Sequence, residues 1–490
     1  MEKTKTAKAM KHPDWHLSGK ERLSYYTGDM GRSAAASILT VFMATFLLFQ
    51  GVEPMAVAGV TAVIKVIDAL DDVIFGYFVD RLKITEWELA KKIAGEGKYL
   101  PWYRLTFWTF PLAVILFFLM PKGLPVAGKL VWYTVTYLLY DFTCTLSEVP
   151  MSSMIMTLTD NTDERNNVLK QKTIFSTVFT LILGIGWPML ISEHVGLPVT
   201  SVGIISAVVC FFFMLPLARG VKEYNAGLKN VENSEDKQYG IMDMLRCVKT
   251  NKYMAIYLLY SMLKLLSGAG AAVALFVSFY LFHDSMITTL ATPLALIPGF
   301  LLQVFSDKIQ KKLGRRNCLL YIMFINAAVY TMMYFCGYGN IWIIIALIAL
   351  GGIFNFPCAV VQSFLIPDTI EYTRYKTGED CAGIFYALNS FVNKAMSGLA
   401  GSLGLAILGL FGFQAVNASS FADLEGTVQP QSAMNGMWFL FSLFPAICYL
   451  LSGLVMLLYN LRDNDAQLMA KCNAGEISRE ECEKQLSRKY

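Results

Sequence analysis

Residues 198–218 read PVTSVGIISAVVCFFFMLPLA and contain no charged side chain. A helix needs about 20 mostly apolar residues to cross the hydrocarbon core of a bilayer, and this stretch is long enough. Twelve comparable runs lie along the chain, near 30–50, 55–79, 105–120, 130–157, 174–192, 198–218, 253–282, 287–305, 318–338, 341–366, 382–413 and 435–460. The sequence therefore predicts an all-α, polytopic membrane protein with 12 transmembrane helices.

The composition agrees with a chain that lies largely in lipid. Of its 490 residues, 55% are apolar and 16% are charged, against about 25% charged in soluble domains. This balance argues against a soluble enzyme or a nucleic-acid-binding protein. The ten cysteines include no CxxC pair, and the four histidines lie in tails or near connections without an HExxH motif. We therefore expect no disulfide framework, no enzymatic chemistry and no cofactor.

Basic residues are distributed unevenly among the connections. The two tails and every second connection hold 35 of the 41 Lys and Arg residues, whereas the other six connections hold one, Lys122. Short loops rich in Lys and Arg stay in the cytoplasm. The pattern predicts an inner-membrane protein of multi-pass topology with both termini in the cytoplasm.

The long polar connection at 219–252 divides the runs six and six. We expect an N-terminal tail and six-helix bundle at 1–218, a cytoplasmic linker at 219–252, a second bundle at 253–461 and a cytoplasmic tail at 462–490. A weak internal repeat agrees, since GYFVDR at 76–81 resembles QVFSDK at 303–308. Two parallel six-helix halves are the pattern of the major facilitator fold.

Ionisable side chains gather in two of the apolar runs, although each costs about 2.5–3.5 kcal/mol at the centre of a bilayer. The second run carries Lys65, Asp68, Asp71 and Asp72. In a helix, Lys65, Asp68 and Asp72 lie on one stripe, with Asp71 close beside it. The cluster is acidic in excess.

The fourth run carries Asp141, Thr145 and Glu148, which share one helix face. Several carboxylates with a neighbouring hydroxyl suit a monovalent cation or a proton, because oxygen ligands replace hydration and clustered negative charge raises proton affinity. The alternative is structural. Lys65 then neutralises nearby acids, and the remaining carboxylates reach a helix end or the polar interface.

The C-terminal runs contain Lys264 and Lys394 and almost no acids. Lys394 lies too deep in its run to reach the interface easily, and a hydrated cavity shared with Asp68 or Asp72 would satisfy its charge. For Lys264, a functional role and a lysine that reaches the interface or a local acceptor are both open.

Asp29 and Arg32 lie one helical turn apart at the start of the first run, just after Tyr25 and Tyr26. A carboxylate held by an arginine accepts two hydroxyl groups of a polyol. The alternative is an interfacial ion pair at a helix start.

Four stretches in this order resemble the glycoside–pentoside–hexuronide:cation symporters, the melibiose-permease-like branch of the major facilitator superfamily. They are TGDMG at 27–31, IDALDD at 67–72, GKYLPW at 97–102 and EYTRYKTG at 371–378. The likeness extends over almost the whole chain. It implies the fold expected above and a transport function.

The resemblance also implies roles for individual residues. The cation-binding positions are Asp68, Asp71, Asp72 and Thr145, with Asp68 and Asp72 as metal ligands if the ion is Na⁺; the substrate-binding positions are Asp29 and Glu148; and the coupling positions are Lys65 and Lys394. From their place beside these residues, we add Arg32 and Ser152 to the substrate-binding set and Asp141 to the coupling set.

Three departures from the melibiose-type pattern bear on the substrate and the ion. Ser152 stands where that pattern has tryptophan, and Thr173 aligns with its fifth-span arginine, with Lys172 one place off. Losing an indole and a guanidinium removes two ways of holding a pyranose. Asp71 replaces a common Asn and favours proton coupling if two acids share a proton.

These features predict a secondary active transporter that imports a sugar or glycoside, pentoside or hexuronide by symport with Na⁺ or H⁺, with Li⁺ as a further candidate ion. The halves would alternate access to a midplane site. The alternative is a passive facilitator or exchanger of a related or non-sugar polar solute on the same fold. We expect a small sugar and the lipid bilayer as partners, no nucleic acid, and function as a monomer.

Overall fold

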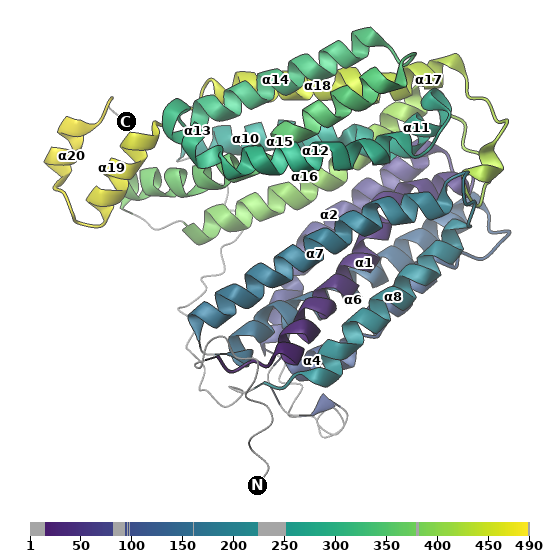
Figure 1. Ribbon diagram of the computed structural model, residues 1–490, viewed down its shortest axis with the longest axis horizontal. Coiled ribbons are helices and arrows are strands. Elements are labelled where there is room, and N and C mark those ends of the chain that lie inside the picture. Colours follow the sequence, from purple (N-terminus) through teal and green to yellow (C-terminus); the bar gives the residue numbers. More distant parts are fainter. Residues whose placement is uncertain are drawn as a thin grey trace. The chain divides into compact units, whose positions relative to one another are not determined.

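The computed structural model describes residues 15–81, 94–95, 97, 99–159, 161–223, 251–378 and 382–488, without the side chains of 69–81, 162 and 307. In these ranges the regular structure is helical (Figure 1), and one isolated β-bridge joins Gln50 and Asn417. The all-α prediction is therefore confirmed.

Ten helical segments of the described chain are long and apolar enough to cross a membrane. The two other predicted runs lie in α2 (Pro54–Arg81) and α6 (Val126–Leu158), which are also long helices. These are the helices that carry the clustered acids. Their polar side chains lower the mean hydropathy but leave the helix lengths sufficient for a span.

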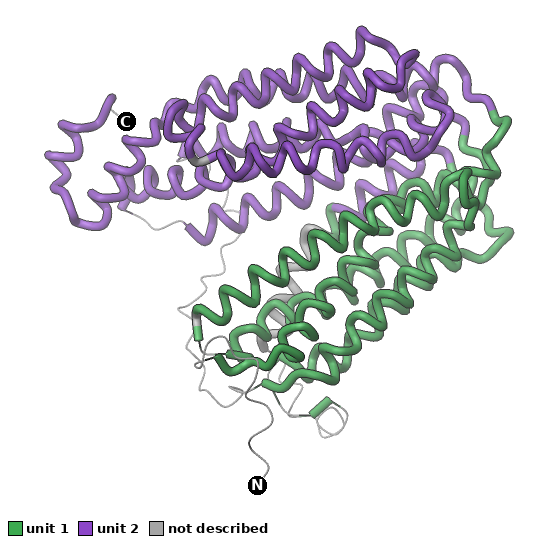
Figure 2. Tube along the Cα trace, in the orientation of Figure 1, with its two compact units in different colours: residues 1–52, 66–235, 415–427 green, residues 53–65, 236–414, 428–490 purple. Residues whose placement is uncertain are grey.

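The chain forms two compact units (Figure 2). The first contains 1–52, 66–235 and 415–427, and the second contains 53–65, 236–414 and 428–490. The division runs through α2, between Lys65 and Val66. The domain boundaries expected at 218 and 253 stay a prediction, because residues 224–250 lie outside the described chain.

The first unit is built around α1. It contains the second part of α2 and all of α6. Its other helices are α1 (Gly19–Phe49), α4 (Leu100–Thr106), α5 (Thr109–Phe118), α7 (Thr162–Ile191), α8 (Val199–Gly220) and the short η3 (Ala422–Leu424). Helix α1 packs against α7 and α8. A Cβ atom at Gly31 would lie 2.7 Å from the carbonyl oxygen of Cys210. Glycine therefore permits the close approach of α1 and α8.

Glu164 ties the N-terminus of the described chain to the start of α7. Its side chain is fully buried and accepts hydrogen bonds from the backbone N–H groups of His16 and Leu17, both at 3.0 Å. The Thr159 hydroxyl donates at 2.6 Å and Arg22 at 2.8 Å. These four donors compensate one buried carboxylate.

We predict that Glu164→Gln lowers thermal stability, because an amide offers one oxygen where the carboxylate satisfies four donors. Each hydrogen bond to a charged group contributes about 1.5–3 kcal/mol. The thermal midpoint of the purified protein in detergent measures the effect. Glu21→Gln is the control, because Glu21 is half-buried in the α1 capping box, where glutamine serves as well as glutamate, and equal midpoints for both variants would contradict the prediction.

The second unit contains the remaining helices. They are the first part of α2, α10 (Lys252–Leu266), η2 (Ser267–Val273), α11 (Ala274–Phe282), α12 (Ile287–Val304), α13 (Ser306–Leu313), α14 (Arg315–Cys336), α15 (Ile341–Thr377), α16 (Ala382–Leu410), α17 (Gln431–Trp438), η4 (Phe439–Leu443), α18 (Phe444–Met456), α19 (Asp463–Asn473) and α20 (Arg479–Gln485).

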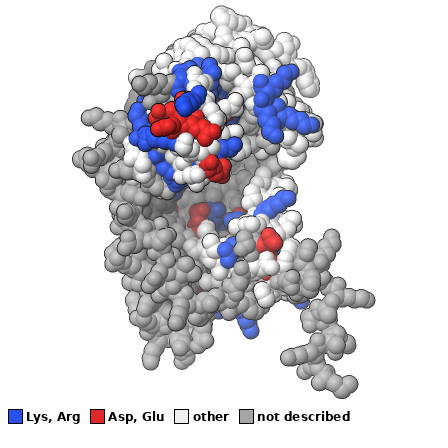
Figure 3. Space-filling model, turned by 90° about the vertical axis from the view of Figure 1, so that its left-hand side faces the viewer, with Lys and Arg blue, Asp and Glu red and all other residues white. Residues whose placement is uncertain are grey.

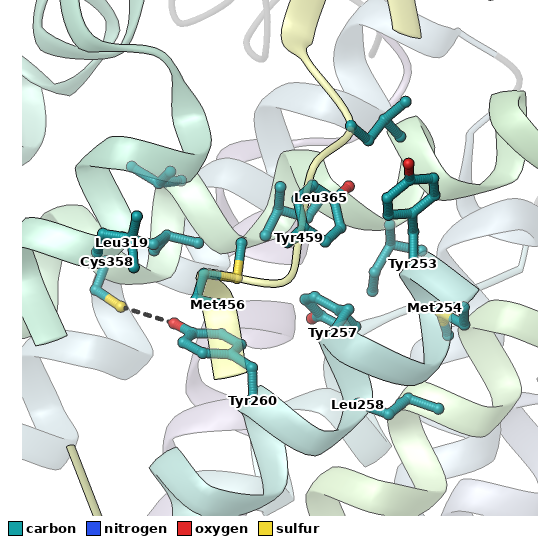
Figure 4. Close-up of a cluster of buried hydrophobic side chains, with 14 of the residues drawn as sticks. Tyr253, Met254, Tyr257, Leu258, Tyr260, Leu319, Cys358, Leu365, Met456 and Tyr459 are labelled. Carbon is teal, nitrogen blue, oxygen red and sulfur yellow. Dashed lines mark hydrogen bonds between the residues drawn. The ribbon is translucent and has the colours of Figure 1, made fainter. Parts of the chain in front are cut away.

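The core of this unit is a cluster of buried tyrosine and aliphatic side chains from α10, α14, α15 and α18 (Figure 4). Tyr253, Tyr257 and Tyr260 lie along one side of α10. The Tyr260 hydroxyl lies 3.6 Å from the sulfur of Cys358. Between helices in a bilayer, such side chains stabilise the structure through close van der Waals packing, so this cluster stabilises the unit.

Two of the predicted runs are interrupted in the structure. The 253–282 run becomes α10, η2 and α11, and the 435–460 run becomes α17, the π-helical η4 and α18. Pro445 lacks an N–H group for regular α-helical bonding, which agrees with the π-helical turn just before it. A Cβ atom at Gly270 in η2 would lie 2.6 Å from the Leu440 carbonyl oxygen. The two interruptions therefore pack closely together.

The connection between α16 and α17 is attached to the first unit by backbone hydrogen bonds. Ala418 N–H donates to Phe49 at 2.9 Å, and Phe421 N–H donates to Ile191 at 3.1 Å. The rings of Phe49 and Phe421 pack edge to face with centroids 5.1 Å apart. Residues 415–427 consequently belong to the first unit, although the helices on either side belong to the second.

Candidate substrate site and coupling residues

The Asp29 carboxylate is the centre of a polar network between α1 and α7. Asp29 is 5% exposed. Arg32 Nη2 lies 3.4 Å and Lys172 Nζ 3.5 Å from its Oδ1 atom. The Ser176 hydroxyl donates to Oδ2 at 2.6 Å. Two cations and a hydroxyl therefore compensate the charge of one buried acid, as burial of a carboxylate requires.

Arg32 also connects this network to α6. Its Nη1 atom donates to Glu148 Oε2 at 3.0 Å, and the Glu148 side chain is 47% exposed. The structure thus brings together the predicted substrate residues Asp29, Arg32 and Glu148. Ser152, about one turn beyond Glu148, is exposed and makes no hydrogen bond within the described part of the chain.

A cavity of about 380 Å³ lies beside this network. Its lining is rich in charged and hydroxyl side chains: Asp29, Arg32, Ser33, Lys172, Thr173, Ser176, Thr177, Thr180 and Leu181. The volume falls in the range of small-molecule sites, about 300–1,000 Å³. Hydroxyl groups both donate and accept hydrogen bonds. The lining therefore suits a small ligand that carries hydroxyl groups.

Lys172 and Ser176 are the site residues that the sequence analysis did not select. In the alignment, Thr173 takes the arginine position and Lys172 lies one residue before it. The Lys172 ammonium group nevertheless reaches Asp29. A polar stripe in the fifth run marks this face, because Thr173, Ser176, Thr177 and Thr180 follow the i, i+3, i+4, i+7 spacing of one helix face. That spacing is readable in the sequence.

We predict that Lys172→Gln weakens substrate binding by about tenfold or more, since a lost charge-assisted hydrogen bond is worth about 1.5–3 kcal/mol. Equilibrium binding of a sugar panel to purified protein is the measurement.

Lys170→Gln is the matched control for this substitution, because Lys170 lies on the same helix, is exposed and has no ion pair within the described chain. Equal losses in the two variants would show a general charge effect and contradict a role of Lys172 in the site.

The predicted cation-binding residues lie partly outside the described side chains. Asp68 accepts a hydrogen bond from the Tyr137 hydroxyl at 3.4 Å, which joins α2 to α6. Asp141 and Thr145, one and two turns beyond Tyr137, are buried.

Asp71 and Asp72 belong to α2, but their side chains are not among those described. The cation-binding set, including Asp68 and Asp72 as Na⁺ ligands, therefore stays a prediction.

Lys65 packs its aliphatic stem against Gly398 of α16. A Cβ atom added to Gly398 would lie 2.4 Å from Lys65 Cγ and 2.5 Å from its Cβ. Real side chains do not approach so closely, so only glycine leaves room for the lysine stem here. The position of Lys65, a predicted coupling residue, depends on this glycine.

We predict that Gly398→Ala displaces Lys65 and lowers coupled uptake, with an overpacking cost of about 1–3 kcal/mol. Uptake in vesicles and the thermal midpoint measure the two effects. Gly401→Ala on the same helix is the control, because its nearest neighbour, Ala272, would lie 4.0 Å from the new Cβ atom. The prediction is wrong if both alanine variants retain full uptake.

The two lysines that the sequence places in the C-terminal apolar runs, Lys264 and Lys394, lie in different surroundings. Lys264 Nζ donates to Gln362 Oε1 at 2.8 Å, and Gln362 Nε2 donates to the Tyr257 hydroxyl at 3.3 Å. Lys264 thus has a local acceptor, one of the two possibilities left open by the sequence. Lys394 is exposed on α16 of this unit, and its coupling role stays a prediction.

A family model described as MFS/sugar transport protein matches residues 24–463. The chain belongs to this family. The match includes both units and the Asp29 network, and it confirms the resemblance to glycoside and hexuronide symporters. This transporter is accordingly a multi-pass membrane protein of the major facilitator fold.

Three curated relatives are similar over nearly their full lengths. The uncharacterized symporter YjmB of Bacillus subtilis is 25% identical, with 91% of this chain and 93% of the relative covered. The isoprimeverose transporter of Lactiplantibacillus pentosus is 24% identical, with coverages of 92% and 90%. A putative 2,3-dihydroxypropane-1-sulfonate exporter of Salmonella typhimurium is 22% identical, with coverages of 91% and 94%.

Among solved structures, the nucleoside transporter NupG is similar to this transporter with a TM-score of 0.61 and 12% sequence identity, covering 90% of this chain and 100% of that one. This likeness shows the fold and carries no information on the substrate.

Proposed function

We propose that this transporter imports a sugar or glycoside by symport with Na⁺ or H⁺. The observation that carries the proposal is the network of Asp29, Arg32, Glu148 and Lys172 beside a hydroxyl-lined cavity. A bound polyol would donate hydroxyl hydrogens to the carboxylates and accept hydrogen bonds from the cations. The proposal includes an inner-membrane location with both termini in the cytoplasm.

The geometry of the network favours a ligand that replaces one of the existing ion-pair contacts over a ligand that only adds new contacts. Arg32 holds the buried Asp29 and the half-exposed Glu148 at once. Glu148 can release Arg32 to water or to a ligand at small cost because it is accessible. A sugar hydroxyl pair would then replace one ion-pair contact and keep every charged group hydrogen-bonded.

The coupling ion would bind among Asp68, Asp71, Asp72 and Thr145. Neutralising part of their mutual repulsion would order α2 and α6, so cation and substrate affinities rise together. Lys65, Asp141 and Lys394 would transmit this change.

Import of one positive charge down a membrane potential of about 100 mV contributes about 2.3 kcal/mol, enough for roughly fifty-fold accumulation before any ion gradient is added.

The relatives support transport of sugar-type solutes, and they also motivate a second candidate. One relative is named an isoprimeverose transporter and another an exporter of a dihydroxypropane sulfonate. A passive facilitator or an exchanger on the same fold would run in the outward direction as well. In that case the acids of α2 would be structural and would not couple transport to an ion.

The decisive experiment measures uptake of a glycoside and hexuronide panel into vesicles, with and without Na⁺ or Li⁺ and over a range of pH. We predict that Asp68→Asn abolishes accumulation against a gradient while counterflow persists, since the variant keeps a substrate site but loses an ion ligand. Asp163→Asn, an exposed acid in the first turn of α7, is the control and should accumulate substrate normally.

Normal accumulation by the Asp68→Asn variant would remove this residue from the coupling site. Uptake that depends on neither cation nor pH would favour the facilitator.

A further inference from the structure

A cavity of about 830 Å³ lies in the second unit where α13 meets α14. Its wall comes from separate parts of the chain: α13, the start of α14, Phe364 of α15, residues 460–467 and Arg488. Figure 3, which faces this end of the unit, shows Lys and Arg side chains on its surface around a smaller group of Asp and Glu. This cavity is distinct from the one beside Asp29, which belongs to the first unit.

The lining of this cavity is strongly basic. Six of its side chains are cationic and one, Asp463, is acidic; the cations belong to Lys311, Lys312, Arg315, Arg316, Arg462 and Arg488. Like charges at this density repel one another and leave a site that attracts anions.

Some of these cations already have partners in the protein. Arg315 forms an ion pair with Asp368 at 2.5 Å, and Arg316 Nη2 donates to the Leu457 carbonyl oxygen at 2.6 Å. Lys311, Lys312 and Arg488 are exposed and have no ion pair within the described residues. Three cations of the lining are therefore available to a ligand.

Gln310 adds a buried donor without a protein partner. The residue is 7% exposed, lines the cavity, and its Nε2 atom has no hydrogen-bond acceptor within the described chain. An unsatisfied buried polar group costs about 1–3 kcal/mol. Oxygen atoms of an anion in the cavity would satisfy this donor and offset that cost.

The first turn of α14 contributes backbone donors to the same wall. The α14 helix begins at Arg315 after Gly314, whose φ of +82° suits glycine. The Arg315 N–H group donates to Asp463 Oδ2 at 2.8 Å, so this helix start already holds one anionic oxygen. The other N–H groups of a first helical turn lack partners in the helix and attract anions.

We propose that this cavity binds the phosphate group of a phosphate ester. The cavity offers several separate cations, an amide donor and a helix start. Together these groups match the oxygens and the charge of a phosphate better than the oxygens and the charge of a single carboxylate. The volume leaves room for an organic group beside the phosphate. The cavity adjoins the ends of two spans, where both a phospholipid headgroup and a soluble phosphate ester can reach it.

The test uses the purified full-length protein in a neutral detergent with two phosphate probes. Dioleoylphosphatidylglycerol represents the headgroup, with dioleoylglycerol, which lacks phosphate, as reference, and retention is measured by native mass spectrometry. Glycerol 3-phosphate represents the soluble ester, with affinity measured by calorimetric titration. We expect phosphatidylglycerol to be retained over dioleoylglycerol; additional binding of glycerol 3-phosphate would identify a soluble ester as a ligand.

Substitutions at the cavity separate specific binding from general charge effects. Lys311→Gln with Lys312→Gln should weaken binding of the retained probe at least about tenfold. The control is Lys471→Gln with Lys484→Gln, which removes the same charge from exposed positions of α19 and α20 outside the cavity. Gln310→Met should also weaken binding but raise the thermal midpoint of the ligand-free protein, because it removes an unsatisfied donor.

The proposal is overturned if phosphatidylglycerol is retained no better than dioleoylglycerol and glycerol 3-phosphate shows no binding in the calorimetric titration. It is equally overturned if the cavity double variant and the control double variant bind alike.

Discussion

The ion pairs of Asp29 with Arg32 and Lys172 fix how the helices of the first unit face one another. A carboxylate that is 5% exposed needs compensation from nearby charges, and α1 and α7 supply it while Arg32 extends to Glu148 on α6. The same constraint governs Glu164, whose four donors hold the chain ahead of α1 against α7. Electrostatic compensation thus orients helices that lipid-facing apolar surfaces alone would leave free to rotate.

The helix pattern was predictable because bilayer thickness and 3.6-residue periodicity act on local sequence. What the sequence did not reveal are the interruptions at η2 and η4, which depend on contact between distant segments. Gly270 packs against the carbonyl group of Leu440, and neither residue indicates this partner locally. The assignment of residues 415–427 to the first unit was not predictable for the same reason, because its hydrogen bonds join residues far apart in sequence.

Part of the candidate site followed from spacing. Asp29 and Arg32 are one turn apart, and Glu148 was found as an acid in an apolar run; all three lie in one network. Lys172 was missed because the alignment placed Thr173 at the arginine position. The flexible side chain of Lys172 reaches Asp29 from the residue just before it. The packing of Lys65 on Gly398 could not be foreseen, since a glycine carries no pattern that identifies its neighbour.

Residues 415–427 connect two helices of the second unit but are hydrogen-bonded within the first unit. The two ends of this loop, at 414–415 and 427–428, are two of the five places where the chain passes from one unit to the other. Its centre is held by the backbone of Phe49 and Ile191. Any movement of one unit with respect to the other would therefore have to be taken up by backbone torsion at these passages, including the two ends of this loop, while its centre stays bonded to the first unit.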